Sequence, residues 1–133
     1  RGLLSAQGIL INNSPCTSVG QTSCTNVGTL PQVVTSSLQK LKFVCQIGTI
    51  QITGGTEWWL HNTHGRDKPV VDISKQYMSG NNNYGEQLYQ CVKKRAEDKY
   101  GAGAFALGKK YTDTDINAEF FNEDALHMHV RFY

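Results

Sequence analysis

The sequence predicts an α+β fold, in which a small and mostly antiparallel sheet packs against two amphipathic helices. Two observations predict it. Residues 30–46 and 88–100 carry apolar side chains at helical spacing, and several shorter stretches alternate apolar and polar residues as half-buried strands do. A chain of 133 residues, 39% of them hydrophobic, is long enough for one core. We therefore expect residues 1–133 to form a single domain, with residues 1–28 as an irregular N-terminal segment that bears disulfides.

The N-terminal half is predicted to contain two strands and the first helix. Residues 1–28 are rich in small side chains, and only residues 8–11 are apolar enough for an edge strand. Residues 29–32, Thr-Leu-Pro-Gln, have the form of a capping box with proline in the first turn, so we expect the helix to begin at Leu30. Residues 49–53 alternate as a strand does, and two glycines end it.

The C-terminal half is predicted to hold a second helix among further strands. The helix is expected to end at Gly101, because glycine is favoured just after a helix. The expected order is a strand at 69–73, a turn at 80–83, the helix through 88–100, a strand at 104–107, a polar connection with a short helical turn at 113–122, and a final strand carrying 127–130.

Composition argues against two classes of partner. The net charge of +2 is small, so we expect no nucleic-acid partner. No apolar stretch approaches the roughly 20 residues that cross a bilayer, so we expect no membrane span in this chain. There is no signal-peptide pattern, but the chain begins at Arg1 and not at methionine. We therefore expect a processed product or an excised domain.

The four cysteines predict two disulfide bonds. Cys45 and Cys91 each fall on the apolar face of a predicted helix, so we pair them with each other and Cys16 with Cys24. An even number of cysteines in a small domain favours an oxidising location, which is the extracellular space, the cell surface or the periplasm. The alternative is that the cysteines are buried free thiols.

All four histidines lie in two short clusters, His61 with His64 and His127 with His129. The final strand alternates apolar and polar residues, which puts His127 and His129 on one face, about 7 Å apart. Two imidazoles so placed can reach a single ion or substrate. The alternative is that the histidines are surface residues or hydrogen-bonded core residues.

Asp72 interrupts the apolar run of residues 70–73. A carboxylate buried there must be paired, hydrogen-bonded or metal-bound, because burying it alone is too costly; the alternative is that it caps a turn. Two histidines and one aspartate, with the fourth position left to water, match the ligand number of a catalytic zinc site.

These motifs resemble those of a known family. They look like the zinc-peptidase fold shared by lysostaphin-type endopeptidases, D-alanyl-D-alanine peptidases and the hedgehog signalling domain, over roughly residues 30–133. The motifs follow one another in the family's order: Ile-Thr-Gly-Gly-Thr-Glu at 52–57, Thr-His at 63–64, Val-Val-Asp-Ile at 70–73 and His-Met-His-Val at 127–130.

The resemblance implies that His64, Asp72 and His129 are the zinc ligands. His64 precedes Asp72 by eight residues, one more than is usual in the family, and we place the extra residue in the loop near Lys68. His61 is expected to neighbour the ligands or to face substrate, and it is the alternative ligand.

The resemblance also implies a general base. Glu123 lies six residues before His129, as in the hedgehog-like Glu-x-x-x-His-x-His arrangement, and we prefer it. Asp124, three residues before His127, is the alternative, and either acid could merely polarise the turn into the final strand. His127 is expected to hydrogen-bond the attacking water or the tetrahedral oxyanion.

The loop after residue 55 supplies the expected substrate contacts. Trp58 and Trp59 are predicted to wall a groove and to stack on sugar or peptide; the alternative is one ring in the core and one on the surface. The D-alanyl-D-alanine peptidases carry Ser-x-x-Arg where this chain has Glu57. Arg66 or Lys68 could replace that arginine.

The resemblance therefore implies a secreted zinc peptidase that hydrolyses amide bonds of peptidoglycan peptides. The alternative is a non-catalytic surface, structural or binding module that keeps the fold, as the hedgehog domain does. Glu57 and the glycine-rich, disulfide-bearing N-terminus favour that alternative.

Overall fold

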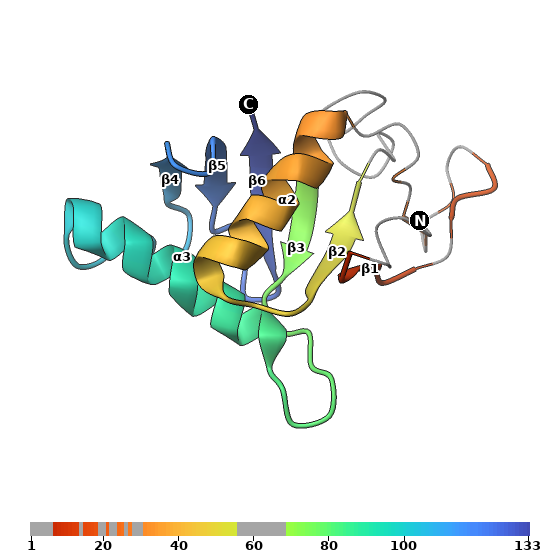
Figure 1. Ribbon diagram of the computed structural model, residues 1–133, viewed down its shortest axis with the longest axis horizontal. Coiled ribbons are helices and arrows are strands. Elements are labelled where there is room, and N and C mark those ends of the chain that lie inside the picture. The colour runs from red at the N-terminus through yellow and green to blue at the C-terminus, as the bar shows by residue number, and fades with distance from the viewer. Residues whose placement is uncertain are drawn as a thin grey trace.

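A computed structural model of the protein describes residues 7–13, 15–18, 21, 24–25, 27, 31–55 and 69–133. A six-stranded sheet and two helices account for the regular structure of these residues (Figure 1). The predicted α+β class is confirmed. The strands are β1 (Ile9–Ile11), β2 (Ile50–Gly54), β3 (Val70–Ser74), β4 (Lys110–Asp113), β5 (Ala118–Phe121) and β6 (His127–Phe132), and the helices are α2 (Gln32–Cys45) and α3 (Tyr84–Tyr100).

The sheet has the strand order β1-β2-β3-β6-β5-β4. Only β1 and β2 run parallel, and the other neighbours are antiparallel. The C-terminal strand β6 thus lies between β3 and β5, next to a strand that is distant in sequence. In this register Asp72 of β3 is directly opposite His129 of β6.

Both helices pack on one face of the sheet (Figure 1). The core-facing side of each helix follows from its period, with Val34, Leu38 and Leu41 buried on α2 and Leu88, Val92 and Ala96 buried on α3. Alternate strand residues complete this core because neighbouring residues of a strand point to opposite faces. The strand members of the core include Ile50, Ile52, Val71, Ile73, Phe120, Met128, Val130 and Phe132.

Both predicted disulfides are present. Cys45, at the end of α2, is bonded to Cys91 of α3, with Cα atoms 5.7 Å apart. Cys16 is bonded to Cys24, with Cα atoms 4.9 Å apart. The first bond joins the two helices across the core face, and the second closes a short loop of the N-terminal segment.

Two element predictions in the C-terminal half are wrong. Residues 104–107 form consecutive turns, in which Ala104 N–H and Ala106 N–H donate to the carbonyls of Gly101 and Gly103. Their apolar character reflects the single buried ring of Phe105. Residues 113–122, predicted as a polar connection with a helical turn, instead complete the β4–β5 hairpin.

The predicted capping box is also wrong in its register. Helix α2 begins at Gln32, and Pro31 is its N-cap residue without a side-chain capping hydrogen bond. Proline suits the start of a helix for another reason, because its ring fixes its own φ and it has no backbone N–H that needs a hydrogen-bond partner. Thr29 and Leu30 lie outside the described residues.

The first turn of α3 lies directly against the chain that leaves β3. A Cβ at Gly85 would come 2.7 Å from the carbonyl carbon of Lys75, and closer still to the backbone nitrogens of Gln76 and Tyr77. Only glycine permits this approach. It fixes the end of β3 relative to α3.

No helix among the described residues combines the length and the apolar character needed to cross a membrane.

Candidate metal centre

Asp72 and His129 form a pair, buried at Asp72 and half-buried at His129, on the sheet face opposite the two helices. Their strands place them directly opposite each other, and His129 Nδ1 lies 2.9 Å from Asp72 Oδ1. The Asp72 side chain is 6% exposed and that of His129 is 19% exposed. As predicted, His127 and His129 alternate with the fully buried Met128 and Val130, which puts both histidines on this face.

Glu123 brings a second carboxylate to the pair. It lies in the connection between β5 and β6 and is exposed. One ligand atom from each of Asp72, Glu123 and His129 lies within 4.8 Å of the others, a spacing that could hold a metal ion. Nitrogen and oxygen ligands bind zinc at about 2.0 to 2.2 Å, so two ligand atoms of one tetrahedral ion lie about 3.3 Å apart. The donor set therefore fits zinc with a small opening of the Asp72–His129 contact.

Asp124, the alternative base, is turned toward the backbone of its own loop. Its Oδ1 accepts hydrogen bonds from Leu126 N–H at 2.7 Å and His127 N–H at 2.8 Å. His127 Nδ1 lies 3.3 Å from the same carboxylate oxygen. Although burial raises the pKa of Asp124, these backbone and histidine hydrogen bonds outweigh it and hold the pKa below its usual value. Asp124 thus shapes the turn that leads into β6 and orients His127.

The same sheet face continues from the pair toward β4. Phe121 of β5 is directly opposite His129, and Lys110 of β4 is directly opposite Phe121. The Lys110 ammonium lies over the Phe121 ring, 5.8 Å from its centroid. Asp72, His129, Phe121 and Lys110 therefore form one row of side chains across four neighbouring strands. The row places a partly exposed aromatic ring and a cation beside the centre.

The other predicted site residues lie outside the described part of the chain. They belong to residues 56–68, between β2 and β3 in the sequence. The ligand role of His64 and the choice between His64 and His61 stay predictions. So do the substrate contacts of this segment, which are Trp58, Trp59, Arg66 and Lys68, and the place of Glu57.

Two buried polar residues next to the centre were not predicted from the sequence. Asn122 is fully buried, and Lys75 is only 6% exposed. Neither belongs to a recognisable motif, and a lone lysine after a strand is normally solvated. The sequence could have pointed to them only by their closeness to predicted site residues. Asn122 immediately precedes Glu123, and Lys75 lies three residues after Asp72.

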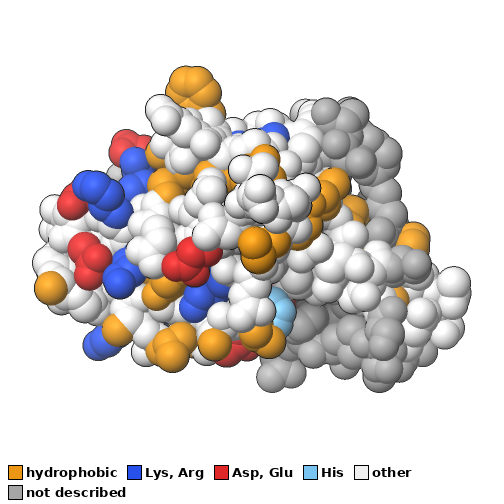
Figure 2. All heavy atoms as spheres, turned by 90° about the horizontal axis from the view of Figure 1, so that it is seen from below, with side chains coloured by type: hydrophobic (Ala, Val, Ile, Leu, Met, Phe, Trp, Pro, Cys, Tyr) orange, Lys and Arg blue, Asp and Glu red, His pale blue; other side chains and the backbone are white. Residues whose placement is uncertain are grey.

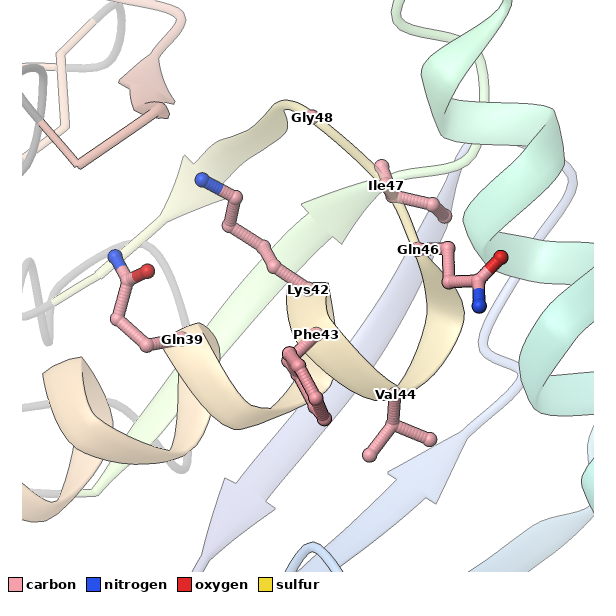
Figure 3. A pocket seen from close by; sticks show the side chains of 7 residues that line it. All are labelled: Gln39, Lys42, Phe43, Val44, Gln46, Ile47 and Gly48. Atoms are coloured by element: carbon pink, nitrogen blue, oxygen red, sulfur yellow. The ribbon is translucent and has the colours of Figure 1, made fainter.

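A separate hollow lies at the end of α2, away from these groups (Figure 3). Its volume is about 670 Å³. Among the described residues, its only ionisable lining side chain is Lys42, whose ammonium donates to the carbonyl of Gln7. Its described lining includes no carboxylate, histidine or cysteine. It is lined by Gln39, Lys42, Phe43, Val44, Gln46, Ile47 and Gly48.

The surface toward α3 and β4 carries charges of both signs. Figure 2 shows lysine and arginine side chains interspersed there with aspartate and glutamate. One such pair is Lys94 and Asp98 of α3, 2.7 Å apart. Interspersed charges of this kind cancel over short distances.

No protein-family model, curated protein or solved structure gives a significant match to this chain. The fold and the site define an α+β protein with a candidate Asp-Glu-His metal centre, formed by the strands β3 and β6 and the connection between β5 and β6.

Proposed function

We propose that this protein is a zinc-dependent peptidase of the type shared by D-alanyl-D-alanine peptidases and the hedgehog domain. The single observation that carries the proposal is the part-buried Asp72–His129 pair with the Glu123 carboxylate beside it. An aspartate on one strand facing the second histidine of a His-x-His strand agrees with the ligand arrangement that the resemblance implies. His64 is proposed as the third ligand.

A zinc ion held by these residues would polarise an amide carbonyl and lower the pKa of water to about 7. Glu123 is exposed, so its carboxylate can take a proton from an attacking water and pass it to the leaving amine. His127, whose Nδ1 faces Asp124, can present its other nitrogen to the developing oxyanion.

The proposed substrate class is the short peptides of bacterial cell wall. The resemblance supports this class. The two disulfide bonds support a location in an oxidising compartment, such as the extracellular space or the periplasm, because disulfides persist there.

The test compares the wild type with Glu123→Gln on purified peptidoglycan and defined muropeptides. The wild type should release free amino groups. The variant should keep its zinc, because Glu123 is proposed as the base and not as a ligand. Its turnover should fall by about two to four orders of magnitude, the usual contribution of a positioned general base.

One result would overturn the proposal, and another would change the assignment of the base. If neither protein releases amino groups across several wall chemistries and short peptides, the alternative of a non-catalytic surface or binding module stands. Glu57 in the place of the family's arginine favours that alternative. If Glu123→Gln instead loses the metal, Glu123 is a ligand and the base has been assigned incorrectly.

A further inference from the structure

Lys75 is a buried cation at the end of the strand that carries Asp72. It follows β3 directly and is only 6% exposed. Lysine is rarely buried without partners that replace its hydration. Burial lowers the pKa of Lys75, whereas the nearby carboxylates of Asp124 and Glu86 raise it. We therefore expect the buried ammonium group to have partners within the protein.

The Lys75 ammonium has three electron-rich partners. It donates to Asn122 Oδ1 at 2.7 Å and to the carbonyl oxygen of Asp124 at 2.7 Å. It also lies over the ring of Tyr89, 4.2 Å from the centroid. A lysine ammonium has three N–H donors and no acceptor, so this environment satisfies it. Its two hydrogen-bond partners are the residues on either side of Glu123.

Asn122 is in turn fixed to the fold. Its side-chain amide donates to the Phe105 carbonyl at 2.7 Å. Its backbone N–H donates to the carbonyl of Lys109 at 3.0 Å, and its own carbonyl accepts from Gly108 N–H at 2.8 Å. The residue before Glu123 is therefore held by the turn after α3 as well as by Lys75.

We call the connection between β5 and β6 the Glu123 loop. The end of this loop that leads into β6 is also bound by Lys75. The backbone N–H of Lys75 donates to the carbonyl of Leu126 at 2.8 Å. Lys75 thus binds the loop through its main chain and its side chain, while its own strand carries Asp72. A shift of β3 would move both Asp72 and the anchor of the Glu123 loop.

We propose that Lys75 is a positioning residue of the centre, whose ammonium ties both neighbours of Glu123 to the strand of Asp72 and so holds the Glu123 carboxylate beside the Asp72–His129 pair. The catalytic consequence of this inference rests on the proposed function. The positioning itself does not, because it concerns the order of a loop.

The test uses Lys75→Met, which keeps the length of the side chain but removes the ammonium group. Arg95→Met is the matched control, since Arg95 of α3 also gives two hydrogen bonds to a buried partner, Asp113, at 2.6 and 3.2 Å. That partner lies on β4 and not in the Glu123 loop. Each variant is compared with the wild type by backbone amide exchange and zinc affinity, and by kcat and KM on muropeptides.

In Lys75→Met, the amides of Leu126 and His127 should exchange faster by about tenfold, the effect of losing one net hydrogen bond. The β3–β6 ladder should keep its protection, and zinc affinity should stay within a few-fold of the wild type. The value of kcat should fall by about 10- to 100-fold with little change in KM, as for residues that orient a catalytic group. Adding Lys75→Met to Glu123→Gln should cause no further loss of kcat.

Arg95→Met should leave the Glu123 loop and kcat unchanged. Lys75 has no positioning role if Lys75→Met leaves the loop amides protected, loosens the whole sheet and not the loop alone, or lowers kcat equally in the Glu123→Gln background. If the wild type hydrolyses nothing, the peptidase proposal falls and the exchange data alone decide the role of Lys75. Should Lys75→Met fail to fold, Tyr89→Leu removes the ring beneath the ammonium, together with the hydroxyl that accepts from the Asn122 side-chain amide at 3.4 Å. It should give a smaller effect of the same kind.

Discussion

Glu123 and Asp124 are adjacent acids with different environments. The Asp124 carboxylate accepts hydrogen bonds from two backbone N–H groups of its own turn, whereas a carboxylate oxygen of Glu123 lies near the Asp72–His129 pair. The sequence could not separate them, because both suit the spacing to a following histidine. The difference arises because Asp124 is the residue from which the chain turns into β6, and a carboxylate at that position bonds locally.

We expect Asp124→Ala to destabilise the protein without removing its metal. The variant loses the cap of the turn into β6, which should lower the free energy of unfolding by about 1 kcal/mol. Urea denaturation measures this loss, and zinc analysis measures the metal. A variant as stable as the wild type would mean that the Asp124 hydrogen bonds contribute nothing to the turn.

At the scale of elements, the β4–β5 hairpin is the part of the fold that the sequence patterns did not predict. Tyr111 and Asp113 are the buried positions of β4, so one of its two inward residues is charged and the strand does not look amphipathic. Asp113 accepts hydrogen bonds from Arg95 at 2.6 and 3.2 Å and from the Tyr111 hydroxyl at 2.8 Å. The partner that makes the burial of Asp113 favourable lies on α3, outside any local window.

The Asp113 network should make stability depend on pH. Burial alone would raise the pKa of Asp113, but the hydrogen bonds from Arg95 and Tyr111 lower it below its usual value. Ionised Asp113 therefore stabilises the fold above its unfolded pKa of about 4, and this contribution is lost as the pH falls through its lowered folded value.

We expect Asp113→Asn to lower the free energy of unfolding by roughly 2 kcal/mol at neutral pH, the scale of a hydrogen bond to a charged group. The difference from the wild type should shrink as the pH falls below about 4. Denaturation curves at several pH values measure it. A difference that grows on acidification would have the wrong sign for a lowered pKa.

For the whole molecule, the Cys45–Cys91 bond joins α2 to α3 across a sequence separation of 46 residues. In the chain-entropy model a loop of this length contributes about 4 kcal/mol of stability. The Cys45→Ala/Cys91→Ala double variant should lose roughly that amount in chemical denaturation. Non-reducing mass spectrometry of the wild type should find no free thiol. Four free thiols in protein made under oxidising conditions would contradict both disulfides and weaken the proposed location.

The sequence predicted the structure best where apolar residues recur with the period of a helix or of a strand. The two helices, the central strands and the placement of both C-terminal histidines on one face follow from apolar spacing alone. Buried Asp72 was predictable as a site because an aspartate in an apolar strand needs a partner. By contrast, Lys75 and Asn122 support the centre from 47 residues apart, and only the sheet topology brings them together.

The central claim is that Asp72 and His129 bind a metal ion. Metal analysis of the purified protein by mass spectrometry, alongside Asp72→Ala, His129→Ala and the double variant, tests it most directly. We predict close to one zinc per chain in the wild type and none in the variants, because a site with at most four protein ligands does not keep zinc after losing Asp72 or His129. The same experiment on His61→Ala and His64→Ala should show the greater loss for His64. Full metal occupancy in the Asp72→Ala/His129→Ala variant would contradict the assignment of the centre.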